Sequence, residues 1–142
     1  EIWAGALPVN VRANVSFFRS SVDGIPGPDN RLAAQPDMTG NLGGDYRFRG
    51  SPFTLGGSVN WTPAYDYRVE DNQLDRIARK AVWEGYLLWH IDSATKLRLS
   101  VTAPDPQDFR TNSNFLVGNE VQSVTDTRTG YLTAALRLEM RL

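Results

Sequence analysis

The sequence contains no cysteine, a single histidine and no excess of either charge. Without cysteine the chain cannot form disulfide bonds or cysteine-ligated zinc sites. His90 is the only histidine, so a metal site built from several histidines and a catalytic pair of histidine bases are both excluded. The 15 Lys and Arg residues nearly balance the 16 Asp and Glu residues. The charge therefore gives no indication of a nucleic-acid partner.

Long apolar runs are also missing. No stretch approaches the ~18 consecutive apolar residues that a transmembrane helix requires. This does not exclude a membrane protein, because a transmembrane strand carries apolar residues only at every second position.

A Gly-x-Ser-x-Gly elbow and a phosphate-binding glycine loop are absent too, so we expect no enzyme, no bound metal and no cofactor. The chain starts at Glu1 without a signal-like segment, and we expect it to be a processed or truncated piece.

Six segments alternate apolar and polar residues with the period of two that predicts β-strands. In one of them Leu97, Leu99 and Val101 alternate with charged and hydroxyl side chains. The sequence therefore predicts an all-β, antiparallel fold of about six strands. The predicted strands cover residues 7–18, 38–48, 53–63, 81–91, 96–103 and 130–142.

The predicted strands are joined by connections of two kinds. Residues 49–52 and 92–95 are short and rich in turn-forming residues. The other three connections, residues 22–37, 64–80 and 104–129, are long, and we expect them to be loops. Short turns at one end and long loops at the other are typical of up-and-down transmembrane β-barrels.

The alternation alone fits either a soluble β-sandwich, with the apolar face as its core, or a barrel with that face in lipid. Predicted strands of ~10–12 residues match the length that crosses a bilayer at a tilt, whereas soluble strands are shorter. Aromatic residues lie near both ends of the apolar face, as in interfacial girdles. The polar face suits both folds. These features favour the barrel, and the girdle residues are Phe17, Trp61 and Trp83 at the long-loop end and Tyr46, Phe48, Phe53 and Trp89 at the short-turn end.

Four stretches resemble TonB-dependent outer-membrane receptors, and more narrowly the proteobacterial group related to ferric-siderophore receptors. They are residues 20–36, 41–47, 55–60 and 131–142. The last stretch is similar to the closing strand of that family, although it ends in Leu142 where many outer-membrane proteins end in Phe or Trp. The resemblance covers most of the chain and concerns barrel strands, with no ligand signature.

The resemblance implies that residues 1–142 are the C-terminal portion of a receptor barrel in the bacterial outer membrane. The family's N-terminal plug domain and TonB-contacting segment are not in these residues. It further implies uptake of a ferric siderophore or similar iron chelate, with TonB, lipid and lipopolysaccharide as partners. Two alternatives stay open: a soluble β-sandwich acting as a binding or structural module, and an outer-membrane pore assembled from several chains.

A few residues in the long connections are candidates for ligand contact. Arg31 could grip carboxylate or catecholate oxygens, although its surroundings also fit a stiff turn. Tyr65, Tyr67 and Arg68 could cup an anionic chelate, and the tyrosines could equally extend the outer aromatic girdle. The oxygen-rich residues 70–76 lack calcium-binding spacing and predict a solvated loop or a short helix.

Overall fold

A computed structural model describes residues 2–3, 8–105 and 108–141 of the chain. It is an all-β structure of eleven antiparallel strands in two sheets, and none of the described residues lies in a helix. In sheet order, the seven-stranded sheet contains β1 (Ile2–Trp3), β2 (Val9–Phe17), β3 (Met38–Arg47), β4 (Phe53–Thr62), β7 (Lys80–His90), β8 (Thr95–Asp105) and β11 (Thr133–Met140). The four-stranded sheet contains β10 (Glu120–Thr129), β9 (Asp108–Val117), β6 (Gln73–Ile77) and β5 (Tyr65–Glu70).

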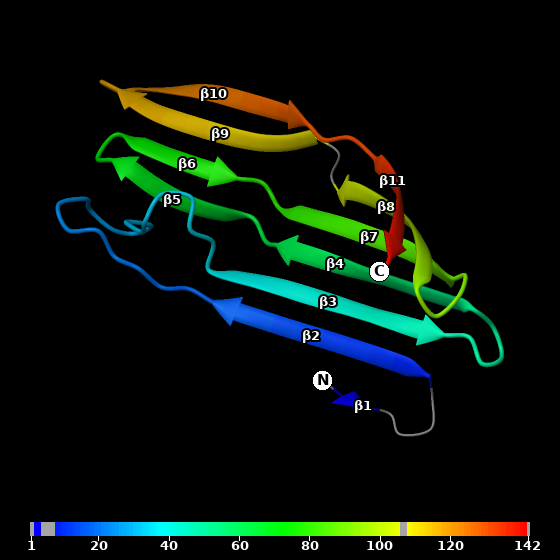
Figure 1. Cartoon of the computed structure of the whole chain (residues 1–142). Coiled ribbons are helices and arrows are strands. Elements are labelled where there is room, and N and C mark those ends of the chain that lie inside the picture. The colour runs from blue at the N-terminus through cyan, green and yellow to red at the C-terminus, as the bar shows by residue number, and fades with distance from the viewer. Residues whose placement is uncertain (1, 4–7, 106–107, 142) are drawn as a thin grey trace.

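The two sheets lie end to end and not face to face (Figure 1). The chain runs from β4 into β5, returns through β6 into β7, and repeats this path from β8 through β9 and β10 into β11. The element pairs with substantial contact are all hydrogen-bonded neighbours within a sheet. The described part of the chain is therefore a single layer, whose strands do not close into a barrel.

The six predicted strands are all present as β2, β3, β4, β7, β8 and β11, with ends within a few residues of the expected ones. They pair in sequence order as an antiparallel meander. The expected strand residues Leu7 and Leu142 lie outside the described residues. The short connections between β3 and β4 and between β7 and β8 are confirmed as turns.

The number of strands and the nature of two long connections were predicted wrongly. Residues 64–80 and 104–129, expected to be loops, form the hairpins β5–β6 and β9–β10. Residues 70–76, expected to be a solvated loop or short helix, form the last residue of β5, the β5–β6 turn and most of β6. Strands β6, β9 and β10 carry polar residues on both faces, so no apolar alternation marks them. Tyr65, Tyr67 and Val69 of β5 do alternate with charged residues, and this short signal was missed. The third long connection, residues 22–37, contains no strand.

The strand registers collect the apolar positions on one face of the seven-stranded sheet. Leu42 lies opposite both Ala13 and Val59, and Leu99 lies opposite both Leu87 and Leu136. Because side chains alternate strictly along a strand, these pairings extend one apolar face from β2 to β11. We call this surface the apolar face.

No layer of the described chain covers the apolar face. Among the described residues the only buried hydrophobic side chain is that of Ala81, which is 4% exposed. Large apolar side chains along the face stay exposed, including those of Val15, Leu42, Leu55, Trp83, Leu99 and Leu136. Soluble monomers seldom expose contiguous apolar surface of more than a few hundred Å². The sheet therefore lacks the partner that its apolar face requires.

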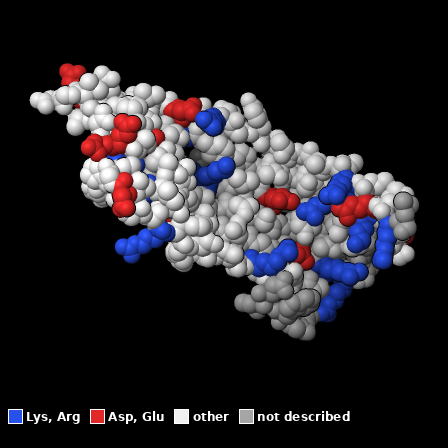
Figure 2. All heavy atoms as spheres, turned by 60° about the vertical axis from the view of Figure 1, so that its left-hand side comes forward, with Lys and Arg blue, Asp and Glu red and all other residues white. Residues whose placement is uncertain are grey.

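The opposite, polar face carries charges of both signs in pairs. Arg12 lies 3.4 Å from Asp45, Arg98 lies 3.1 Å from Glu84, and Arg137 lies 3.6 Å from Glu139. A space-filling view of the molecule shows Lys and Arg side chains interspersed with Asp and Glu side chains among larger uncharged areas (Figure 2). These ion pairs are partly exposed, so each contributes at most about 1 kcal/mol to stability. His90, expected on this face just before a turn, has its Nε2 3.4 Å from the Thr54 hydroxyl.

Candidate functional site

A polar pocket lies in the connection between β2 and β3, at the long-loop end of the sheet. Its volume is about 440 Å³. Backbone bonds organise the connection, because the Val22 amide donates to the Asn30 carbonyl at 2.7 Å and the Phe18 amide donates to the Asp37 carbonyl at 2.8 Å. The lining residues are 18–21, 29–31 and 35–37.

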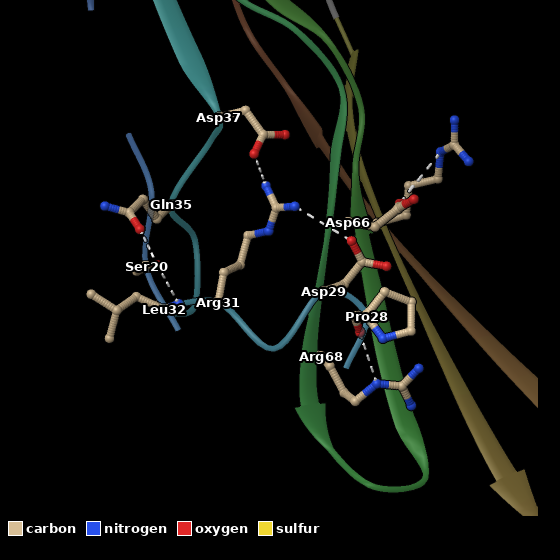
Figure 3. A network of polar contacts seen from close by, with 10 residues as sticks. Ser20, Pro28, Asp29, Arg31, Leu32, Gln35, Asp37, Asp66 and Arg68 are labelled. Carbon is tan, nitrogen blue, oxygen red and sulfur yellow. Dashed lines mark hydrogen bonds and ion pairs between the residues drawn. The ribbon is translucent and has the colours of Figure 1, made fainter. Parts of the chain in front are cut away.

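Arg31 is held inside this connection by two carboxylates (Figure 3). Its Nη1 donates to Asp37 Oδ1, and its Nη2 lies 3.4 Å from Asp29 Oδ1. The Arg31 side chain is only 21% exposed. A cation that already faces two carboxylates has little charge left for an anionic ligand unless those contacts open. The arrangement agrees with the stiff-turn interpretation of Arg31.

The Ser20 side chain joins the two limbs of the connection. Its hydroxyl donates to Gln35 Oε1 and accepts a hydrogen bond from the Leu32 backbone amide at 3.0 Å. Both contacts lie beside the ion pairs of Arg31 (Figure 3). A loop has no regular ladder of backbone hydrogen bonds, and side-chain hydrogen bonds of this type satisfy its polar backbone groups instead. The pocket walls are therefore fixed by polar contacts and not by an apolar core.

Arg68, from strand β5, fastens this connection to the β5–β6 hairpin. Its backbone amide donates to the Asp29 carbonyl at 2.7 Å, and its Nε donates to the Pro28 carbonyl at 3.4 Å. Its Nη1 also donates to the Asp71 carbonyl in the hairpin turn at 3.2 Å. Two segments distant in the sequence, the β2–β3 connection and the β5–β6 hairpin, thus meet at one guanidinium.

Tyr65 and Tyr67 lie on the other face of β5, because they alternate with Arg68 along the strand. Their ring centroids are 6.3 Å apart. The Tyr67 hydroxyl donates to Asp75 Oδ2 at 3.0 Å, and Gln73 donates to the other carboxylate oxygen at 3.1 Å. Asp75 is 7% exposed, and both of its oxygens are satisfied, as a buried carboxylate requires.

This environment disfavours the ionised form of the Tyr67 phenol. Burial, the hydrogen bond to Asp75 and the negative charge of that carboxylate raise the pKa of Tyr67 from 10.0 to about 12. Burial also raises the pKa of Tyr65. Both phenols are therefore protonated at physiological pH, and the Tyr67 proton is already donated to Asp75.

The structure thus divides the four candidate residues into two groups. Arg31 and Arg68 come together through Pro28 and Asp29, whereas Tyr65 and Tyr67 lie across the strand from Arg68. Sequence analysis missed the residues that hold these groups in place. The acidic residues on either side of Arg31 were a visible signal, but nothing in the sequence indicated the bond between Tyr67 and Asp75. The missed residues are Ser20, Asp29, Gln35, Asp37, Gln73 and Asp75.

No cluster of three or more His, Asp or Glu side chains that could hold a metal ion occurs among the residues described by the structure. Across the same residues, no helix is long and apolar enough to cross a membrane.

No family model matches the chain, and no curated protein and no solved structure is significantly similar to it.

Proposed function

We propose that this chain forms part of the wall of an outer-membrane β-barrel in a TonB-dependent receptor that takes up a ferric siderophore or similar iron chelate. The observation that carries the proposal is the apolar face, which continues across the strands from β2 to β11 without a covering layer. In this arrangement lipid covers the apolar face, and the polar face lines the lumen.

Strand length supports the membrane part of the proposal. Strands β2, β3, β4, β7 and β8 contain 9, 10, 10, 11 and 11 residues, and ~9–11 residues cross a bilayer at a tilt. Aromatic side chains lie toward the strand ends, and the rings of Phe53 and Trp89 are 5.9 Å apart at the short-turn end. Such rings suit the boundary between hydrocarbon and head groups.

The end-to-end sheets argue against the soluble sandwich. A sandwich buries the apolar face of one sheet against a second sheet about 10 Å away. Here the second sheet extends the first one, and the strands of the two sheets run into each other (Figure 1). A soluble form would leave side chains such as those of Leu42 and Leu136 in water, at a cost of roughly 25 cal/mol for each Å² of apolar surface.

The receptor part of the proposal has two supports. The first is the resemblance of the strand sequences. The second is the polar site at the long-loop end, where Arg31, Asp29 and Asp37 line a pocket and Arg68 fastens the connection that forms it. In the proposed receptor Arg31, Tyr65, Tyr67 and Arg68 are the candidate contacts for the chelate. TonB would act through a region outside these residues.

A cysteine-free chain allows a direct test of which face meets lipid. Val101 belongs to the apolar face in the middle of β8, and Thr102 is its neighbour on the polar face, opposite Glu84. We would place one spin label at V101C or T102C in the protein reconstituted into phospholipid vesicles. Oxygen, which partitions into lipid, should broaden the signal of the label at 101, and a water-soluble nickel complex should broaden that at 102.

Other outcomes decide between the alternatives. A label at 101 that neither reagent reaches would indicate a sandwich core, and one reached by the nickel complex would place the apolar face in water. Either result contradicts the membrane proposal. Uptake of a radiolabelled ferric chelate by cells with and without TonB separates a receptor from a multi-chain pore, because a passive pore continues to conduct without TonB.

A further inference from the structure

The hairpin β9–β10 carries a regular ladder of hydroxyl and amide groups on one face. Ser123 Oγ donates to Asn114 Oδ1 at 2.7 Å, and Thr125 Oγ1 donates to Asn112 Oδ1 at 2.8 Å. Further along the same face, Thr129 Oγ1 donates to Asp108 Oδ1 at 2.9 Å. Each bond joins residues directly opposite in the register. We call the rungs of Ser123–Asn114 and Thr125–Asn112 the hydroxyl–amide ladder.

The ladder displays donors and acceptors side by side. Because each hydroxyl proton is used within a rung, the hydroxyl oxygen keeps its lone pairs as an acceptor. In the part of the chain that the structure describes, the amide nitrogens of Asn112 and Asn114 have no hydrogen-bond partner, so each keeps two donors. Neighbouring rungs are two residues apart along the strand, or about 6.8 Å. The same donor–acceptor pair is thus repeated at a fixed spacing.

A small pocket lies at the tip of the ladder. It has a volume of about 160 Å³, and its lining includes the apolar side chains of Leu74, Leu116 and Val121. Asn114 contributes the adjoining rung, and Arg68 and Asp71 also line the pocket. Leu116 and Val121 are opposite each other in the register and are 51% and 67% exposed. An apolar patch beside a few oriented polar groups is typical of a small-ligand site.

We propose that the pocket and the hydroxyl–amide ladder together bind a neutral oligosaccharide. Sugar hydroxyl groups both donate and accept hydrogen bonds, which matches the paired donor and acceptor of each rung, and the C–H surface of one ring covers the apolar patch. The two rungs carry no charge. Of the cations beside them on the same face, Arg76, opposite Asn112, is paired with Asp66 at 3.9 Å, and Arg110 lies beyond the second rung. A ligand that lies on the rungs themselves is therefore an uncharged chain of hydroxyl groups and not an acidic polymer. A peptide strand would pair with the outer edge of β10 and not lie on the ladder face, because β9 already bonds to β6 and β10 on its two sides.

The expected affinity is modest. A hydrogen bond at an exposed site replaces one with water and contributes little net free energy, so most of the affinity comes from the apolar patch and the prearranged rungs. We expect a Kd of roughly 1 mM for a short chain. This inference does not depend on iron transport, and its failure would leave the proposed receptor function unaffected.

The test uses the full chain folded in detergent micelles and titrated with maltoheptaose. Binding is followed through the NMR signals of the side-chain amide groups of Asn112 and Asn114. We expect saturable shifts, with binding weakened about 5-fold or more by N112L or T125V, equivalent to about 1 kcal/mol. The matched control is Q122V on the opposite face of β10, which should bind as the wild type does.

Three results would overturn the proposal. Unchanged amide signals at ~10 mM sugar would mean that the site is not a saccharide site of the expected strength. Equal affinity for glucose and maltoheptaose would mean that the ladder contributes nothing beyond the pocket. Binding of a sulfated oligosaccharide without binding of maltoheptaose would assign the interaction to the arginines and contradict a neutral ligand.

Discussion

The ring of Tyr86 occupies the space in which a β-carbon on Gly56 would lie. The two residues are directly opposite each other on β4 and β7, and the ring lies over the glycine backbone. The guanidinium of Arg98 stacks on the same ring, 3.9 Å from its centroid, and also donates to Glu84. Gly56, Tyr86 and Arg98 therefore form one stack on the polar face, and the absence of a side chain at Gly56 makes it possible.

The first prediction is that G56A weakens the sheet by displacing this stack. The added methyl group would overlap the Tyr86 ring, which must swing away from Arg98. We expect a loss of about 1 kcal/mol, the order of a partly exposed cation–π contact, measured as a lower urea midpoint in detergent. The matched control is G85A, because nothing lies within 4 Å of a β-carbon at Gly85, so this change should be neutral or slightly stabilising. Equal effects of the two substitutions would contradict this role of the stack.

The second prediction concerns the titration of Tyr67. Its pKa of about 12 in the folded protein lies above the ordinary value of 10.0, so its neutral form is favoured by folding. The resulting stabilisation is fully present below pH 10 and is lost as the pH rises from 10 toward 12. Phenolate absorbance should show a tyrosine that titrates at about pH 12 and is missing in Y67F. In D75N the pKa of Tyr67 should fall but stay above 10.0, because burial remains its largest cause. If Y67F instead lost a tyrosine that titrates below pH 10, the assignment of the raised pKa to Tyr67 would be wrong.

The sequence predicted the long strands whose two faces differ. In β8, Leu97, Leu99 and Val101 mark the apolar face clearly, and the observed strand covers this segment. In β10 the valines at 121 and 124 fall on opposite faces, since they are three residues apart. Hydrophobic alternation is produced by a difference in environment between two faces, so a strand that is polar on both faces leaves no such signal.

A turn signal was nevertheless present for the missed hairpin β9–β10. Gly118 and Asn119 connect the paired residues Val117 and Glu120, and a Gly-Asn pair between two β-rich runs predicts a tight hairpin. Gly118 has a φ of 63°, which a residue with a side chain adopts at a cost. The contacts of the candidate site could not be predicted from such local sequence signals. The meeting of Arg68 with Pro28 depends on how a long loop folds back onto a distant hairpin, which local patterns do not encode.

The third prediction concerns the turn between β7 and β8. Asp92 Oδ1 accepts hydrogen bonds from the backbone amides of Ala94 and Thr95, both at 2.7 Å. These bonds favour the carboxylate and hold the pKa of Asp92 below its ordinary value of 3.8. The stabilisation of the turn is therefore present above pH 3.8 and is lost as the pH falls through the lowered pKa.

NMR titration should show the Asp92 carboxyl and the Ala94 and Thr95 amides changing together at a pH below 3.8. D92A should shift both amide signals toward unbonded values at every pH. D92N should retain part of the effect because its side-chain oxygen still accepts. S93A is the control, since it keeps the carboxylate and should leave the titration in place. Amide signals in D92A that match the wild type would show that the turn does not use this side chain.

The fourth prediction separates local from global stability at the candidate site. R68Q removes the side-chain bonds to Pro28 and Asp71 and leaves the backbone bond to Asp29. These contacts are exposed, so the free energy of unfolding should change by no more than about 0.5 kcal/mol. The connection between β2 and β3, however, has few other anchors. Its amide groups should therefore exchange with solvent several-fold faster in R68Q, and faster again when R31Q also removes the bonds to Asp29 and Asp37.

Hydrogen exchange followed by mass spectrometry of peptides covering residues 18–37 measures this effect, with the hairpin β9–β10 as an internal reference. The matched control is R79Q, which removes another exposed ion pair, with 3.5 Å between Arg79 and Asp105, away from the connection. R79Q should leave exchange in residues 18–37 unchanged. If R68Q also left it unchanged, the backbone bond to Asp29 alone would anchor the connection. If all three variants accelerated exchange equally along the chain, the arginines would act on the stability of the whole sheet, and a local fastening at Arg68 would be wrong.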